Sequence, residues 1–192
     1  MPRSTYDSIL HNQTPYELKQ LQSQSNSWFR EEVNRIKKNR YNKYQFIIRG
    51  KEDTTKRLEI GKMYMFEYFP KHANELPVWD RYPLVIPFNT APNGFIAINF
   101  HYLPYRIRAW LLDRLTKVSN EHTNKVRINW QILKGLSRAN VGAFATHRYL
   151  INHITSPFRL VKIEDYPKAI MLPLAGWYGE DKVLVNKFRR MI

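Results

Sequence analysis

The side chains that could bind a metal ion or transfer protons are few and poorly clustered. The chain has no cysteine, which excludes disulfides, thiolate metal sites and cysteine nucleophiles. No two histidines have the H-E-x-x-H or H-x-H spacing that would bring two imidazoles to one metal ion. The six histidines are His11, His72, His101, His122, His147 and His153.

Nuclease chemistry needs clustered carboxylates that hold a divalent ion, with a cation nearby. The closest arrangement is Glu67 with Lys71, four residues apart, but Pro70 ends the strand between them, so the two side chains are not held on one strand face. G-x-S-x-G, G-x-G-x-x-G and P-loop motifs are missing. The sequence therefore favours a protein that is not an enzyme, with no catalytic residue, metal site or cofactor. A Mg²⁺-dependent nuclease using Glu67 and Asp80 is the weakest alternative.

The chain is strongly basic, with 31 Lys and Arg against 16 Asp and Glu, a net charge of +15. The excess lies in the two flanks, because residues 61–105 carry equal numbers of each sign. Basic flanks suit a surface that faces polyanions or acidic protein partners. A contiguous basic face would favour DNA as the partner, whereas a scattered one would favour proteins.

Two basic clusters are candidate contacts for nucleic acid or for an acidic partner. In the first, cations interleave with Tyr41 and Tyr44, so that rings could stack on bases while cations hold phosphates. The second is the basic C-terminal end. No helix-turn-helix, RNA-recognition or zinc-finger signature accompanies them. The candidate residues are Arg35, Lys37, Lys38, Arg40, Lys43, Lys187, Arg189 and Arg190.

The most distinctive run of the sequence is rich in aromatic residues and proline. It reads Phe69-Pro70-Lys71-His72, Leu76-Pro77-Val78-Trp79-Asp80, Pro83-Leu84-Val85, Gly94-Phe95 and Asn99-Phe100-His101-Tyr102-Leu103-Pro104. Over residues 59–115 this pattern resembles a family of virion structural proteins that recurs in T4-like and other large contractile-tailed bacteriophages. The resemblance implies a structural component that joins subunits in the tail or baseplate, or at the head–tail junction. It also implies a place in the virion, assembled in the bacterial host cytoplasm.

The expected partners are other phage virion proteins, contacted by multiple copies in a symmetric assembly. Interface cores favour Trp and Tyr, so Trp79 and Tyr102, with the neighbouring Asp80, are the interface candidates. The alternative is a basic DNA-associated phage protein, such as one that binds the end of the genome. No membrane partner is expected, because no stretch approaches 18 apolar residues.

The N-terminal third reads as an arm followed by a helix. Thr14, Pro15 and Glu17 fit the N-cap, N1 and N3 positions of a capping box. A second helix is expected after Ser27, with an apolar stripe of Trp28, Phe29, Val33 and Ile36. We expect an N-terminal arm over residues 1–26 and a single α+β domain over residues 27–192.

Period-2 alternation predicts strands over residues 63–69, 82–88 and 95–102, which would form a small antiparallel sheet at about residues 61–103. A further strand is expected at 44–49. Helices should pack on this sheet: one beginning with Pro104 at N1, then two between residues 124 and 150, broken near Asn140. A C-terminal β-hairpin would pair residues 158–164 with 169–174, before a short basic tail helix over residues 180–191. The core stripe of the Pro104 helix should be Ile107, Trp110, Leu111, Leu115 and Val118.

Overall fold

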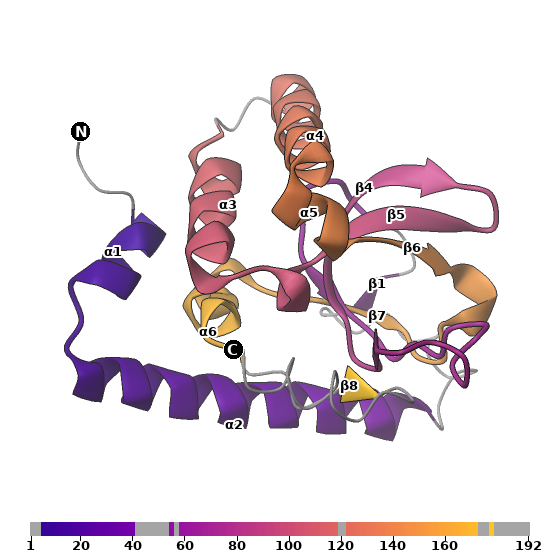
Figure 1. Ribbon diagram of the computed structural model, residues 1–192, viewed down its shortest axis with the longest axis horizontal. Helices are drawn as coiled ribbons and strands as arrows, with labels where there is room; N and C mark the ends of the chain where they lie inside the picture. Colours follow the sequence, from indigo (N-terminus) through magenta and orange to yellow (C-terminus); the bar gives the residue numbers. More distant parts are fainter. Residues whose placement is uncertain (1–4, 41–53, 56–57, 119–121, 173–176, 179–192) are drawn as a thin grey trace.

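A computed structural model of the chain describes residues 5–40, 54–55, 58–118, 122–172 and 177–178 (Figure 1). The fold is α+β, as predicted. The helices are α1 (Thr5–His11), α2 (Pro15–Arg40), α3 (Tyr105–Lys117), α4 (His122–Arg138), α5 (Asn140–Ala145) and α6 (Tyr166–Ile170). Short 3₁₀ segments are η2 (Phe100–Tyr102), η3 (Ile151–His153) and η4 (Ile163–Asp165).

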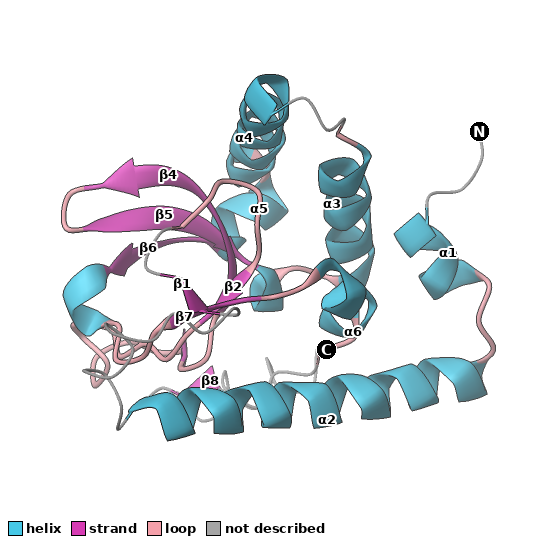
Figure 2. Ribbon diagram, turned by 180° about the vertical axis from the view of Figure 1, so that it is seen from behind, coloured by secondary structure: helices cyan, strands magenta, loops and turns pink. Residues whose placement is uncertain are grey.

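One antiparallel sheet has the strand order β1-β7-β2-β4-β5-β6 (Figure 2). Its strands are β1 (Thr54–Thr55), β2 (Tyr64–Met65), β4 (Leu84–Ala91), β5 (Gly94–Asn99), β6 (Thr146–Leu150) and β7 (Phe158–Leu160). A separate pair joins β3 (Trp79–Asp80) to β8 (Trp177–Tyr178). The second and third predicted strands correspond to β4 and β5, which pair as an antiparallel hairpin, although residues 100–102 form η2 instead of strand. Asn93 in the hairpin turn has φ 55°, a conformation that asparagine tolerates.

Both faces of the sheet are covered. Met63 and Met65 lie in the main core with residues of the helices, whereas Tyr64, Phe66 and Tyr68 lie in an aromatic cluster on the other face. The predicted alternation is therefore confirmed, although only residues 64–65 of the predicted 63–69 strand pair as a strand. Tyr68 adds a single bridge to Ile154.

Helix α2 begins where the capping box predicts. The backbone N–H and the hydroxyl of Thr14 donate to Glu17 Oε2 at 2.7 and 2.8 Å, and these hydrogen bonds lower the pKa of Glu17. The predicted break before Ser27 is wrong, because α2 runs continuously to Arg40. The predicted stripe is buried in the core, where it consists of Trp28, Phe29, Val33 and Ile36.

The N-terminal residues also contact the rest of the fold. Tyr6 of α1 is buried, and its N–H donates to Asp113 Oδ1 of α3 at 3.1 Å. The boundary that we predict at residue 26 falls inside α2. No helix within the described ranges is long and apolar enough to cross a membrane.

The core stripe of α3 differs from the prediction. Leu111 and Leu115 are buried as expected, but Trp110 is 41% exposed, whereas Arg108 and Asp113 are buried. The prediction fails here because α1 and α6 both pack on α3 and extend its buried surface to polar positions, which apolar periodicity does not reveal. Pro104 occupies the N-cap position rather than N1.

We expect Trp110→Ala to lower the free energy of unfolding by only about 1 kcal/mol, because much of this ring already faces solvent. Phe100→Ala is the matched control: its ring is 0% exposed, so its loss should cost about 3–5 kcal/mol. Urea denaturation of both variants measures the difference. Equal losses of unfolding free energy in the two variants would show that the Trp110 ring is part of the core.

The C-terminal half contains two further corrections. The break near Asn140 is confirmed, but residues 146–150 form β6, which pairs with β5, instead of continuing a helix. The strand predicted at 158 is confirmed as β7, yet it pairs with β1 and β2. Its predicted partner is instead helix α6, whose Ala169 and Ile170 are buried in the main core. The strand expected at 44–49 and the helix expected at 180–191 lie outside the described residues.

Candidate nucleic-acid interface

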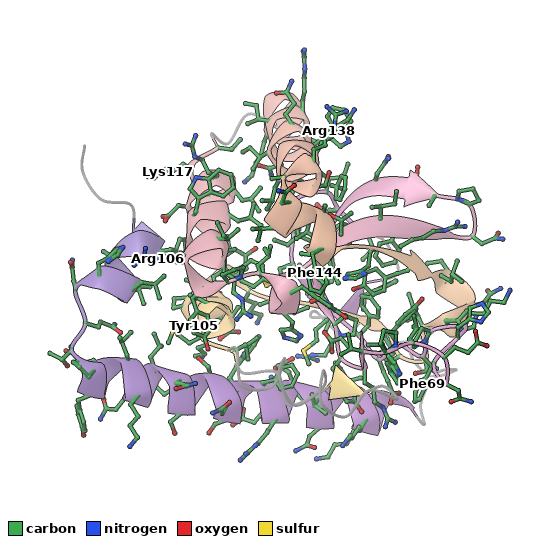
Figure 3. All side chains as sticks on the ribbon, viewed as in Figure 1. Phe69, Tyr105, Arg106, Lys117, Arg138 and Phe144 are labelled. Atoms are coloured by element: carbon green, nitrogen blue, oxygen red, sulfur yellow. The ribbon has the colours of Figure 1, made fainter. Side chains whose placement is uncertain are left out.

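Exposed basic side chains lie on both α3 and α4, two neighbouring helices, and Figure 3 labels Arg106 and Lys117 on α3 and Arg138 on α4. Asp113 is the only carboxylate in the sequence of α3, α4 and α5, and it is buried against Tyr6. The positive charge of these helices therefore has no exposed acidic side chain beside it on the same elements. We call this surface the α3–α4 face, formed by Arg106, Arg114 and Lys117 on α3 and by Arg127 and Arg138 on α4.

Aromatic rings lie among these cations. The guanidinium carbon of Arg114 lies 5.6 Å from the centroid of the exposed Trp110 ring. On α4, Lys134 Nζ lies 4.2 Å from the centroid of the half-buried Trp130 ring. Cations beside aromatic rings can hold phosphates while the rings contact bases. The α3–α4 face thus has the chemistry that the sequence interpretation assigned to other residues.

The first predicted cluster lies at the end of α2. Lys37 and Lys38 are exposed, while Arg35 is paired with Glu32 at 2.7 Å and with Glu31 at 4.0 Å. α2 thus exposes charges of both signs, whereas the carboxylate of α3, Asp113, is buried and α4 has none. Arg40 ends α2, and Lys43, Lys187, Arg189 and Arg190 lie outside the described residues. DNA or acidic-partner contact at this set stays a prediction.

The sequence interpretation did not single out the α3–α4 face as a site. A signal was present, because residues 105–150 contain nine Lys and Arg against two Asp and Glu. The cations of α3 and α4 are spaced along two helices and form no local cluster in the sequence like that of Arg35 to Lys43. Their proximity depends on how those helices pack.

The interface candidates lie in partly or fully buried positions. Trp79 is half-buried, and its Nε1–H donates to the Ala73 carbonyl at 3.1 Å. Tyr102 is half-buried and meets the ring of Phe144 at a centroid distance of 5.5 Å. Asp80 is 5% exposed. Their contact with other virion proteins stays a prediction.

Asp80 belongs to a buried polar network that joins β3, β5 and η2. Its Oδ2 accepts from Asn99 Nδ2 at 3.0 Å and lies 2.7 Å from His101 Nδ1, while its Oδ1 accepts from the Tyr82 N–H at 3.1 Å. His101 is 1% exposed. Burial, with the nearby Asp80 charge, raises the pKa of Tyr102 well above its ordinary value. The network is closed to substrate and holds the backbone on which Tyr102 sits.

Glu67 is likewise engaged. It is fully buried, its Oε1 accepts from Arg81 Nη2 at 2.9 Å, and its Oε2 accepts from Thr155 Oγ1 at 2.8 Å. Among the residues that the structure describes, no group of three His, Asp or Glu side chains is arranged to hold a metal ion. Neither Glu67 nor Asp80 is therefore open to a Mg²⁺ ion in this arrangement, which weakens the nuclease alternative.

Comparison with known proteins gives a family match. The model of a family described as phage T4 terminal DNA protecting protein matches residues 5–188. Neither a curated protein nor a solved structure matches the chain. The match confirms the relation to T4-like phages that the sequence pattern indicated, and the description of the family names the protection of terminal DNA, not a joint between virion subunits.

Proposed function

Because this chain belongs to the phage T4 terminal DNA protecting protein family, we propose that it binds the ends of phage DNA and shields them from exonucleases. This function is the alternative that the sequence interpretation kept beside the virion joint. The family match supports it better than the tail, baseplate or head–tail role.

The α3–α4 face is the observation that carries this proposal in the structure. Five exposed cations lie on two neighbouring helices whose only carboxylate is buried. Phosphate contacts of this kind position a protein on DNA without reading its sequence. Since no base-reading motif accompanies these helices, they suit a protein whose target is defined by being an end and not by its bases.

Protection of the DNA then requires only that the protein stays bound at the end, and it needs no catalysis. An exonuclease must seat the terminal nucleotides before it can cleave them, so a protein bound there blocks it sterically. No bond is made or broken by the protector, in line with our proposal that the protein is not an enzyme. The protected fraction should rise with protein concentration along a simple binding curve.

The test is digestion of a linear blunt-ended duplex by an exonuclease while the protein is titrated in. We expect digestion to slow in proportion to the occupied ends, whereas an unrelated basic protein of similar charge should protect far less. Equal digestion at saturating protein would refute the proposed function. In a parallel reaction, protein plus Mg²⁺ alone should leave the DNA intact. Cleavage there would instead revive the nuclease alternative.

A place in the virion is part of the same proposal, since a protein that holds the end of packaged DNA would remain with it. Contacts with other virion proteins through Trp79 and Tyr102 are proposed on this basis. Mass spectrometry of purified heads and tails tests it. Recovery with heads that contain DNA is expected, and absence from both fractions would oppose a virion location.

A further inference from the structure

An exposed apolar patch lies where α5 meets η2. Phe144 is 53% exposed and Val141 is 43% exposed, although both belong to a short helix that packs on η2, β5 and β6. The two residues are three positions apart and so share one side of α5. Figure 3 labels Phe144 at the end of this helix. We call Tyr102, Val141, Phe144 and His147 the aromatic patch.

Contacts between aromatic rings support the patch. The Tyr102 ring meets the Phe144 ring nearly edge-on, with centroids 5.5 Å apart, and lies 4.5 Å from the His147 ring. Burial lowers the pKa of His147, which favours its neutral form. Phe144 therefore packs on an uncharged aromatic support, while the residue as a whole remains 53% exposed.

This uncharged patch adjoins the basic helix α4. α4 packs against α5 and ends at the exposed Arg138, two residues before α5 begins. An apolar surface of this kind within a basic region matches the end of a duplex, which presents one unstacked base pair surrounded by phosphates. Internal duplex offers only phosphates and groove edges, since every base pair there is stacked on both faces.

We propose that Phe144, supported by Tyr102, stacks on the terminal base pair of the duplex and gives the protein its preference for ends. This inference rests on the proposed function and adds to it a means of telling an end from internal DNA. Phosphate contacts alone cannot make that distinction, because the backbone charge is the same at both places. Stacking of a base on an aromatic side chain contributes enough to change affinity by about tenfold.

The experiment compares two DNA substrates of one sequence and length: a blunt-ended duplex, and the same duplex with both ends closed by hairpin loops. We expect the wild-type protein to bind the open duplex about tenfold more tightly. Phe144→Ala and Phe144→Leu should lose this preference while keeping their affinity for the closed duplex, and Phe144→Trp should retain it. Ile151→Ala is the matched control, since Ile151 is 48% exposed, apolar and outside the patch.

A second readout follows the terminal base directly. With 2-aminopurine at the last base pair, the wild-type protein should change its fluorescence on binding, and Phe144→Leu should not. If Phe144→Leu keeps the full end preference, or loses affinity equally for both substrates, end stacking is wrong while DNA binding stands. If the wild-type protein neither prefers ends nor protects them, the proposed function fails as well. Melting temperatures of the Phe144 variants should fall by no more than about 4 °C, because Phe144 is 53% exposed and its truncation should cost about 1 kcal/mol.

Discussion

Neutralising Arg106, Arg114, Lys117 and Arg127 together is expected to lower the affinity for duplex DNA by about a thousandfold at about 0.1 M salt. Each phosphate contact contributes about −0.9 to the slope of log affinity against log salt concentration, because binding releases condensed counterions. Loss of about four contacts should therefore make the slope less negative by about 3.6. The fold should survive, since exposed charges contribute little to stability.

Fluorescence anisotropy over a salt series measures both quantities. A matched control neutralises four exposed cations elsewhere, namely Lys19, Arg30, Lys62 and Lys71. This control should weaken binding modestly through net charge and leave the slope nearly unchanged. If the two quadruple variants behave alike, DNA is bound without a defined face. If only neutralisation of Lys37 and Lys38 changes the slope, the contact lies at the end of α2 instead.

Arg108→Leu is expected to lower the free energy of unfolding by about 4 kcal/mol or more, which is a large share of the stability of an ordinary domain. The Arg108 side chain is 0% exposed, and its hydrogen bonds go to backbone carbonyls. Its guanidinium donates to the carbonyls of His101 and Leu103 at 3.0 and 2.8 Å, and to those of Ile170 and Leu172 at 3.0 and 3.1 Å. Leucine would leave all four carbonyls buried without this donor.

Thermal unfolding measures the effect, with an expected fall in melting temperature of about 8–16 °C. Arg106→Leu is the control: it makes the same chemical change on the same helix at an exposed position, and its effect should stay within about 0.5 kcal/mol.

Burial lowers the pKa of Arg108 to about 10, so the side chain is still charged at neutral pH. Arg108→Lys should rescue poorly, because an ammonium lacks the planar fork that reaches carbonyls on separate segments. Equal melting of the Arg108→Leu and Arg106→Leu variants would refute this role.

Local patterns in the chain determine much of the fold. The Thr14–Glu17 capping box, the alternation from Met63 to Tyr68 and the hairpin of β4 and β5 were all predictable, because each depends on residues close together in the chain. The basic composition likewise raised DNA as a partner, since net charge needs no fold to be counted. What the sequence determined by itself was therefore the fold class and several elements, and it left DNA and acidic proteins as the two possible kinds of partner.

Long-range packing decided the rest. Trp110 faces solvent and Arg108 is buried because the carbonyls that satisfy Arg108 include those of Ile170 and Leu172, more than 60 residues away. Long-range packing also explains why β7 pairs with β2 instead of forming a C-terminal hairpin with residues 169–174. It also brought the spaced cations of α3 and α4 onto neighbouring helices and left Phe144 exposed beside Tyr102. Only the tertiary structure could place these side chains, because the free energy that selects their positions comes from contacts that local periodicity does not contain.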